Sequence, residues 1–334
     1  MIVRKMNLGI FCLVMFLVLG AHHRTSWAQS NRPLRIDATR ISWTQLSFFA
    51  KNYWVEVSTD IQLRSMAASE LDALLLKSPK GNPIQSVTPE AAQMTIDTTI
   101  DPRFRSPVNI HNRIWFDPTN ASALGRVRLR RGEDDFKKMY RFTQKGVFRH
   151  RIEPTNAEEA MLEPEKWTDI KDTFFPHDTD RLECPVVSER SLLIIALSAY
   201  AMSRDNKPLT ICVFGKRQLH RVQIHKEGTQ SIKVDYIEKK QESEIRKDSS
   251  VRALKMVITA QPIPPHLEDP ENFSFLGLHR DICVYIEPAS GLPITVSGII
   301  PTVGKVDLEL QEVRLKPSSN KTSNNTFPGA VALH

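Results

Sequence analysis

Short runs of alternating apolar and polar residues, separated by turn-forming residues, dominate the chain from residue 112 onward. Successive side chains of a strand point to opposite faces, so this alternation indicates a sheet with one buried face. Clear examples run from Leu254 to Ile258, from Ile282 to Ile286 and from Val306 to Leu310. Many such runs with close turns predict a mainly β protein: a curved antiparallel sheet or a partly open β-barrel.

Further strands are expected at residues 113–116, 126–131, 138–143, 147–152, 209–214, 219–225 and 231–237. Turns are expected at residues 133–135, 144–146, 215–218, 226–228, 291–293 and 301–304. Residues 238–250 are charged and are expected to form a hairpin tip, and residues 154–185 a long irregular connection.

One buried helix is predicted from Ser188 to Ser203. Ser188 is the expected N-cap, with Glu189 beside the positive helix end. Residues 192–202 are apolar around nearly the whole circumference, which predicts a helix that the sheet wraps. An outer-membrane barrel also alternates, but this helix, the charged strand faces and the acidic segment 154–185 argue against one.

The first 28 residues have the three parts of a secretory signal peptide. Arg4 and Lys5 precede an apolar run from Leu8 to Ala21, and Ser26 to Ala28 is a small-x-small cleavage signature. The run is shorter than the ~20 residues of a spanning helix, although an uncleaved anchor remains the alternative. We expect cleavage after Ala28 and a periplasmic or secreted protein without a membrane span in its mature form.

The rest of the chain is expected to divide into an N-terminal β-containing segment and a main antiparallel β domain. The first covers residues 29–110 and the second residues 111–316, which include the helix at about 188–203. Residues 317–334 are rich in Ser and Asn and are predicted to be a disordered tail.

Three cysteines remain after signal cleavage: Cys184, Cys212 and Cys283. At most one internal disulfide can form, and any two of the three could supply it. Cys212 and Cys283 both fall in the middle of predicted strands and are the candidate pair; three buried thiols, or a reactive or metal-binding cysteine, are the alternatives. No CxxC motif is present, so we expect no structural metal site, and no cofactor.

The most unusual local feature is positive charge between residues 126 and 151. Ten basic residues lie there: Arg126, Arg128, Arg130, Arg131, Lys137, Lys138, Arg141, Lys145, Arg149 and Arg151. Only Glu133, Asp134 and Asp135 oppose them. Alternation places Arg126, Arg128 and Arg130 on one strand face, and Arg149 and Arg151 likewise share a face.

Like charges opposite each other on paired strands destabilise a sheet by up to ~1 kcal/mol, so something should compensate. An anionic partner is one explanation, which would make Arg126, Arg128, Arg130, Arg149 and Arg151 a binding face. The acidic residues Glu158, Glu159, Glu163 and Glu165 could instead fold over this face. Plain solvation with salt screening is the third explanation.

The sequence has none of the common catalytic motifs, among them GxSxG, Walker, GxGxxG and HExxH. His220 is predicted to point inward, either as a hydrogen-bonded core residue or as a catalytic base. Asp101, Asp117, Asp178, Asp180 and Asp281 could supply carboxylates. The catalytic residues of any enzyme activity are therefore unknown, and the pattern favours a protein that is not an enzyme.

Short β and turn motifs lie at residues 140–142, 146–149, 167, 192–193, 291–293, 308 and 310. Through these motifs, residues 126–316 resemble an uncharacterised family of periplasmic or envelope β proteins, domain of unknown function 3108. The resemblance implies an envelope β protein without an assigned activity, and it transfers no catalytic residue.

We therefore expect an exported, non-catalytic envelope protein that binds or handles an amphipathic or anionic component. Lipid, an acidic envelope polymer and envelope proteins are the expected partners. Nucleic acid is not an expected partner, because the net charge of +7 becomes smaller once Arg4, Lys5 and Arg24 are removed with the signal peptide. A secreted or periplasmic hydrolase and an envelope assembly scaffold are the alternatives.

Overall fold

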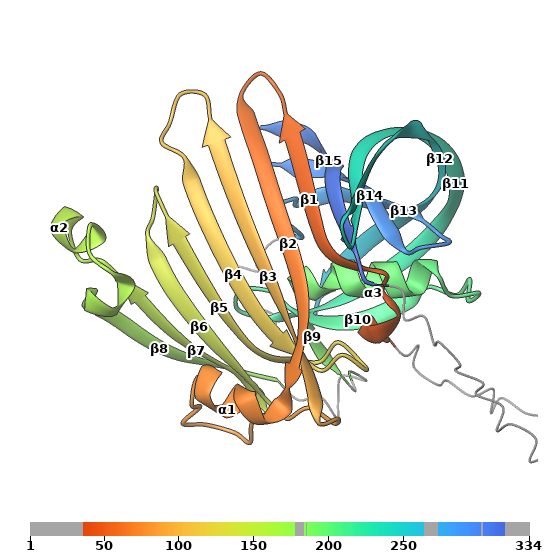
Figure 1. The fold of residues 1–334 in the computed structure, drawn as a ribbon. Coiled ribbons are helices and arrows are strands. Elements are labelled where there is room, and N and C mark those ends of the chain that lie inside the picture. The colour runs from red at the N-terminus through yellow and green to blue at the C-terminus, as the bar shows by residue number, and fades with distance from the viewer. Residues whose placement is uncertain (1–35, 178–183, 185, 264–272, 302, 318–334) are drawn as a thin grey trace, which may run out of the picture. The chain divides into compact units, whose positions relative to one another are not determined.

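β-strands make up most of the protein, whose computed structural model describes residues 36–177, 184, 186–263, 273–301 and 303–317 (Figure 1). The strands are β1 (Trp43–Lys51), β2 (Val55–Ala67), β3 (Glu90–Pro102), β4 (Val108–Phe116), β5 (Ala123–Arg131), β6 (Phe136–Thr143), β7 (Gly146–Glu153), β8 (Asp169–Pro176), β9 (Val187–Glu189), β10 (Leu209–Phe214), β11 (Leu219–Lys240), β12 (Ser243–Pro262), β13 (Arg280–Glu287), β14 (Leu292–Ile300) and β15 (Gly304–Leu315). The helices are α1 (Leu71–Leu74), α2 (Ala157–Ala160) and α3 (Leu193–Ala201), and the 3-10 turns are η1 (Ala38–Arg40), η2 (Ala68–Glu70), η3 (Pro164–Lys166) and η4 (Arg190–Leu192).

All these strands belong to one curved sheet. Its order is β8-β7-β6-β5-β4-β3-β2-β1-β15-β14-β13-β12-β11-β10-β9. Neighbouring strands are antiparallel except β9 and β10. The far end of β11 (residues 237–239) also pairs in parallel with residues 312–314 of β15, which closes strands β11 to β15 on themselves. Strands β1 to β8 continue outward from β15 to the edge strand β8, so the predicted mainly β, curved-sheet class is confirmed.

Helix α3 is buried, as its apolar sequence predicts. Every residue of α3 except Ala199 is buried, and the helix packs against β13, β14 and η1. The turn before β14 approaches it closely, because a Cβ at Gly291 would lie 2.8 Å from the Ser198 carbonyl oxygen. Gly291 also has a φ of +67°, which favours glycine.

The start of this helix differs from the prediction. Ser188 is not the N-cap, because it lies in β9 and pairs with Val213 of β10. The cap belongs to Glu189, whose side chain accepts a hydrogen bond from the Ser191 backbone N–H. Residues 190–192 then form η4 before α3 begins.

The predicted strands at residues 113–152 lie inside β4 to β7. Three other expectations, about a turn, an irregular segment and a domain boundary, are wrong. Residues 226–228 are no turn: β11 continues through a bulge between Lys226 and Gly228, where Gly228 has a φ of +111°. The segment expected to be irregular contains β8, which pairs with β7 along its whole length. The expected domain boundary at residue 110 falls inside β4, which pairs with both β3 and β5.

The disulfide joins Cys184 to Cys212, not Cys212 to Cys283 as predicted. Cys212 lies in β10 and Cys283 in β13, and β11 and β12 separate these strands in the sheet. Adjacent strands are about 4.8 Å apart, so the two Cα atoms are too distant for the ~4.4–6.8 Å of a disulfide. Cys283 is a free, half-buried thiol.

The predicted signal segment 1–28 lies outside the described residues, as does the predicted tail from residue 318 onward. Within the described ranges, no helix combines the length and the apolar character needed to cross a membrane.

Candidate ligand-binding face

One face of strands β1 to β8 changes from apolar to basic across the sheet. Directly paired positions on adjacent strands form a row on this face: Leu46, Ile61, Ile96, Asn112, Arg128, Lys138 and Arg151. A second row is Phe48, Thr59, Thr98, Ile110, Arg130 and Phe136. We call this surface the pocket face.

The strand register brings the two predicted arginine sets together. Arg126 and Arg149 both lie opposite Tyr140 of β6, one on each side. Arg128 and Arg151 in the same way flank Lys138. The predicted sharing of faces within each strand is confirmed, and both sets occupy the same face.

Lys138 therefore lies between two guanidinium groups. Burial, followed by the charges of Arg151 and Arg128, lowers the pKa of Lys138 to about 7. Its ammonium nitrogen lies 3.5 Å from the centre of the Phe136 ring. At neutral pH this side chain is thus close to equally protonated and neutral, unlike an exposed lysine.

Arg128 is half-buried and forms no ion pair with a carboxylate of the described residues; its guanidinium lies 5.6 Å from the centre of the Phe136 ring. Its Nε is buried without a hydrogen-bond acceptor among the described residues. Burial and the nearby Arg190 and Arg126 lower the pKa of Arg128 to about 9, so it stays charged at neutral pH.

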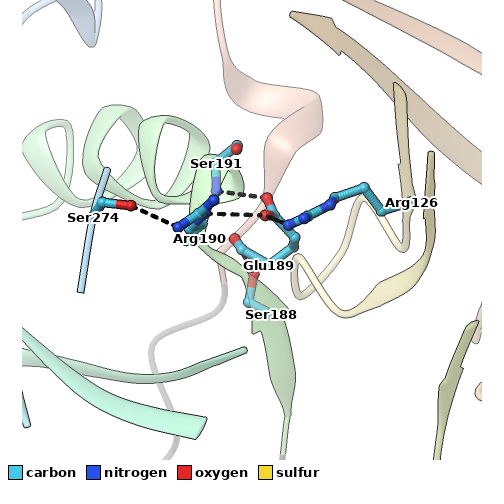
Figure 2. Close-up of polar contacts among 6 residues, drawn as sticks. All are labelled: Arg126, Ser188, Glu189, Arg190, Ser191 and Ser274. Carbon is cyan, nitrogen blue, oxygen red and sulfur yellow. Dashed lines mark hydrogen bonds and ion pairs between the residues drawn. The ribbon is translucent and has the colours of Figure 1, made fainter. Parts of the chain in front are cut away.

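Arg126 has a different role from the one predicted. It forms an ion pair with Glu189, in which the side chains are 3% and 0% exposed (Figure 2). Glu189 also contacts Arg190, at 3.8 Å from Nε, while Arg190 donates to Ser274 Oγ at 2.6 Å. Because its charge is neutralised inside the fold, Arg126 links β5 to the start of α3 and is not a free anion site.

The three other predicted arginines have weaker or more exposed partners. Arg130 lies 3.9 Å from Asp134, a carboxylate that is 82% exposed. Arg149 donates to Thr173 Oγ1 at 3.2 Å and lies over the Phe175 ring. Arg151 pairs with Glu153 on the same face.

The acidic segment does not neutralise this surface. Glu165 pairs with Lys137, whose side chain belongs to the opposite face of β6. Glu159 instead accepts hydrogen bonds from Thr155 and Thr168, which lower its pKa to about 2. None of the four residues Glu158, Glu159, Glu163 and Glu165 lines either of the pockets described below, so the expectation that they fold over these arginines is wrong for the pocket face.

Two adjoining pockets open on this face. One, of about 590 Å³, is lined by apolar side chains of β2 to β4 and by the arginines of β5, and on its other side by residues that include Glu189, Arg190 and His279. Its apolar wall includes Val57, Ile96, Ile100, Val108 and Ile110.

The second pocket, of about 760 Å³, is lined by the basic side chains of β5 to β7, among them Lys138, Arg149 and Arg151. Arg128 and Arg130 line both pockets and so mark their junction. Pockets with an apolar wall and a few convergent polar groups are typical of small-molecule sites.

The residues considered for catalysis do not gather here. His220 is 1% exposed, packs against the Phe273 ring and lines neither pocket. Asp117 is buried and accepts hydrogen bonds from Val87 and Thr119. Asp101 and Asp281 are exposed on β3 and β13, and Asp178 and Asp180 lie outside the described residues.

The described residues also contain no cluster of three or more His, Cys, Asp or Glu side chains able to hold a metal ion.

The sequence prediction missed Lys138 as a site residue, and it missed the whole apolar wall. Both depend on which residues of neighbouring strands face each other. The signal for Lys138 was present, because the short turns of two consecutive hairpins set the register of β5, β6 and β7.

No protein-family model and no curated protein matches the chain. A solved structure from Brucella abortus is similar, with a TM-score of 0.41 and 6% sequence identity over 83% of this chain and 99% of that chain. It is described as a beta-barrel-like protein of domain of unknown function DUF1849. The resemblance to domain of unknown function 3108 is not supported by these matches and stays a prediction.

Proposed function

We propose that the protein binds an amphipathic lipid with an anionic phosphate head in the cell envelope, without changing it chemically. The observation that carries the proposal is the change from apolar to basic side chains across one continuous face, with pockets on both sides of Arg128 and Arg130. An acyl chain fits the apolar wall of β2 to β4, and a phosphate fits the guanidinium groups beside it.

The location in the envelope rests on two further features. Residues 1–28 have the composition of a secretory signal, and Cys184 and Cys212 form a disulfide. Structural disulfides persist mainly in oxidising compartments such as the periplasm and the extracellular space.

The test compares two single-chain lipids that share an acyl chain, each kept below its micelle concentration. Lysophosphatidylglycerol is anionic and lysophosphatidylcholine is zwitterionic. We expect calorimetry to show tighter binding of lysophosphatidylglycerol, and much weaker binding of tail-free glycerol phosphate.

Two double substitutions distinguish the contribution of the head-group contacts to lipid affinity from that of the acyl-chain contacts. Arg128→Gln with Arg130→Gln should weaken lysophosphatidylglycerol binding by about tenfold or more, because charge-assisted hydrogen bonds to the phosphate are lost. The loss should be smaller for lysophosphatidylcholine, whose choline cation already offsets the attraction between its phosphate and this basic surface. Ile100→Gln with Ile110→Gln should weaken the binding of both lipids. Lys240→Gln with Arg246→Gln, on the exposed β11–β12 hairpin, removes the same charge and serves as the control.

Equal binding of both lipids by the unmodified protein would contradict the proposed head site. Binding of glycerol phosphate as tight as that of the lysolipid would remove the role of the apolar wall and favour an acidic polymer as the ligand.

A further inference from the structure

Three exposed aromatic side chains gather at one end of the sheet. Tyr53, Trp54 and Phe104 are 64%, 55% and 72% exposed. The Tyr53 and Trp54 ring centres are 4.8 Å apart, and those of Trp54 and Phe104 are 6.2 Å apart. We call these three residues, together with Arg103, the aromatic tip.

Two neighbouring turns hold the aromatic tip in place. The turn between β1 and β2 is fixed by Asn52, whose side-chain oxygen accepts hydrogen bonds from the backbone N–H groups of Trp54 and Val55, at 2.8 and 3.0 Å. The turn after β3 is joined to it by the Arg103 N–H, which donates to the Trp54 carbonyl at 3.0 Å. The exposed rings therefore belong to a defined structure.

Arg103 supplies a positive charge among these rings. Its guanidinium carbon lies 4.5 Å from the centre of the Tyr53 ring and 5.6 Å from that of Phe104. No carboxylate among the described residues forms an ion pair with Arg103. The charge is thus available for an anion that approaches from outside.

The aromatic tip is continuous with the mouth of the apolar pocket, because Trp54 and Phe104 are also lining residues of that pocket. A molecule that leaves a surface in contact with the aromatic tip would meet the apolar wall directly.

We infer that the aromatic tip is a docking surface for a phospholipid bilayer. The rings enter the interfacial layer, where tryptophan and tyrosine are favoured, and Arg103 meets lipid phosphate groups. A polysaccharide fits less well, because the rings are tilted at 89° and 60° to one another and form no flat stacking platform. The inference concerns how the protein meets a membrane and does not depend on lipid binding in the pockets.

Trp54 provides a local probe of this contact. The other tryptophans of the described chain, Trp43, Trp115 and Trp167, are at most 2% exposed. Fluorescence is measured for the full chain with phosphatidylcholine–phosphatidylglycerol vesicles whose acyl chains carry bromine, a short-range quencher. The difference between the unmodified protein and Trp54→Phe isolates the Trp54 signal, because every other tryptophan and the N-terminal segment are common to both.

We expect brominated vesicles to quench this difference signal, and vesicles without bromine to leave it unquenched. Trp54→Ser with Phe104→Ser should lower vesicle partitioning by about tenfold, since two apolar rings no longer leave water. Met161→Ser with Ile245→Ser, which alters exposed apolar residues elsewhere, should change partitioning little.

Absence of quenching of the Trp54 signal would overturn the inference. So would a concentration-dependent dimer, seen by sedimentation without vesicles and abolished by the Trp54 and Phe104 substitutions, because a second copy would then cover the aromatic tip. In both cases lysolipid binding in the pockets could still be measured, so the two proposals fail separately.

Discussion

At the scale of single residues, Lys138 differs most from what its sequence neighbours suggest. Lys137 and Lys138 are adjacent, yet Lys137 pairs with Glu165 on one face of the sheet while Lys138 lies between Arg128 and Arg151 on the other. A cation in this position is unfavourable until an anion arrives. Binding of a phosphate should therefore raise the pKa of Lys138.

This linkage predicts a pH dependence of lipid affinity. The pKa of Lys138 is lowered to about 7 in the free protein, so the side chain is protonated below that value and neutral above it. Above about pH 7, binding an anion must also take up a proton, and the affinity for lysophosphatidylglycerol should fall as the pH rises from about 6 to about 8, below the range in which Arg128 loses its charge. The phosphate diester of this lipid does not titrate in that range.

Calorimetry at several pH values measures the effect, and two neighbouring variants assign it. Lys138→Gln should flatten the profile, whereas Lys137→Gln should leave its slope unchanged. A profile that keeps its slope in Lys138→Gln would show that another group titrates.

The faces of single residues were predictable only within each strand. Alternation correctly grouped Arg126 with Arg128 and Arg130, and Arg149 with Arg151. Whether those groups share a face depends on register, and a slip of one residue would move a whole strand's side chains to the opposite face. The alternation also does not show which arginine is buried in an ion pair. Arg126 has the same sequence pattern as Arg128, but its buried partner, Glu189, is distant in sequence.

At the scale of elements, the Arg126–Glu189 pair connects β5 to the start of η4 and α3. Glu189 both neutralises Arg126 and caps the Ser191 N–H (Figure 2). The prediction of a helix beginning near Ser188 was close in sequence but missed this contact, because no local pattern shows a partner from β5.

Removing this carboxylate should be costly. Glu189→Gln leaves a buried guanidinium without its counter-charge, and we expect the free energy of unfolding to fall by about 3–5 kcal/mol. Chemical denaturation measures the change. Asp235→Asn is the matched control, because it breaks an exposed pair with Arg246 and should alter stability little. Equal effects of the two substitutions would contradict the structural role of Glu189.

Two errors at this scale have the same physical origin. The segment at residues 226–228 has the composition of a turn, but the ladder between β11 and β12 absorbs it as a bulge. The cysteine pairing also depends on strand order, which places Cys212 and Cys283 on strands that are not neighbours. Composition predicts local bends and strands well. Whether a bend forms a turn or a bulge, and which strands are neighbours, depends on long-range strand pairing.

At the scale of the whole molecule, the sheet presents an apolar wall on β2 to β4 and a basic wall on β5 to β7, on one continuous face. The curved sheet and the buried helix follow from alternation and from an apolar helix sequence. The wall of β2 to β4 was not predicted, because the segment up to residue 110 was taken as separate from the main domain. The sheet joins the two through β4 and thereby creates the amphipathic face.

The most direct test of this account is a crystal structure of the complex with lysophosphatidylglycerol that carries bromine on its acyl chain. Anomalous scattering from bromine locates the chain. The account predicts bromine peaks beside Ile100 and Ile110, with the phosphate within about 3.2 Å of the Arg128 guanidinium. A chain located outside the pocket face, or a phosphate bound away from β5 to β7, would contradict it.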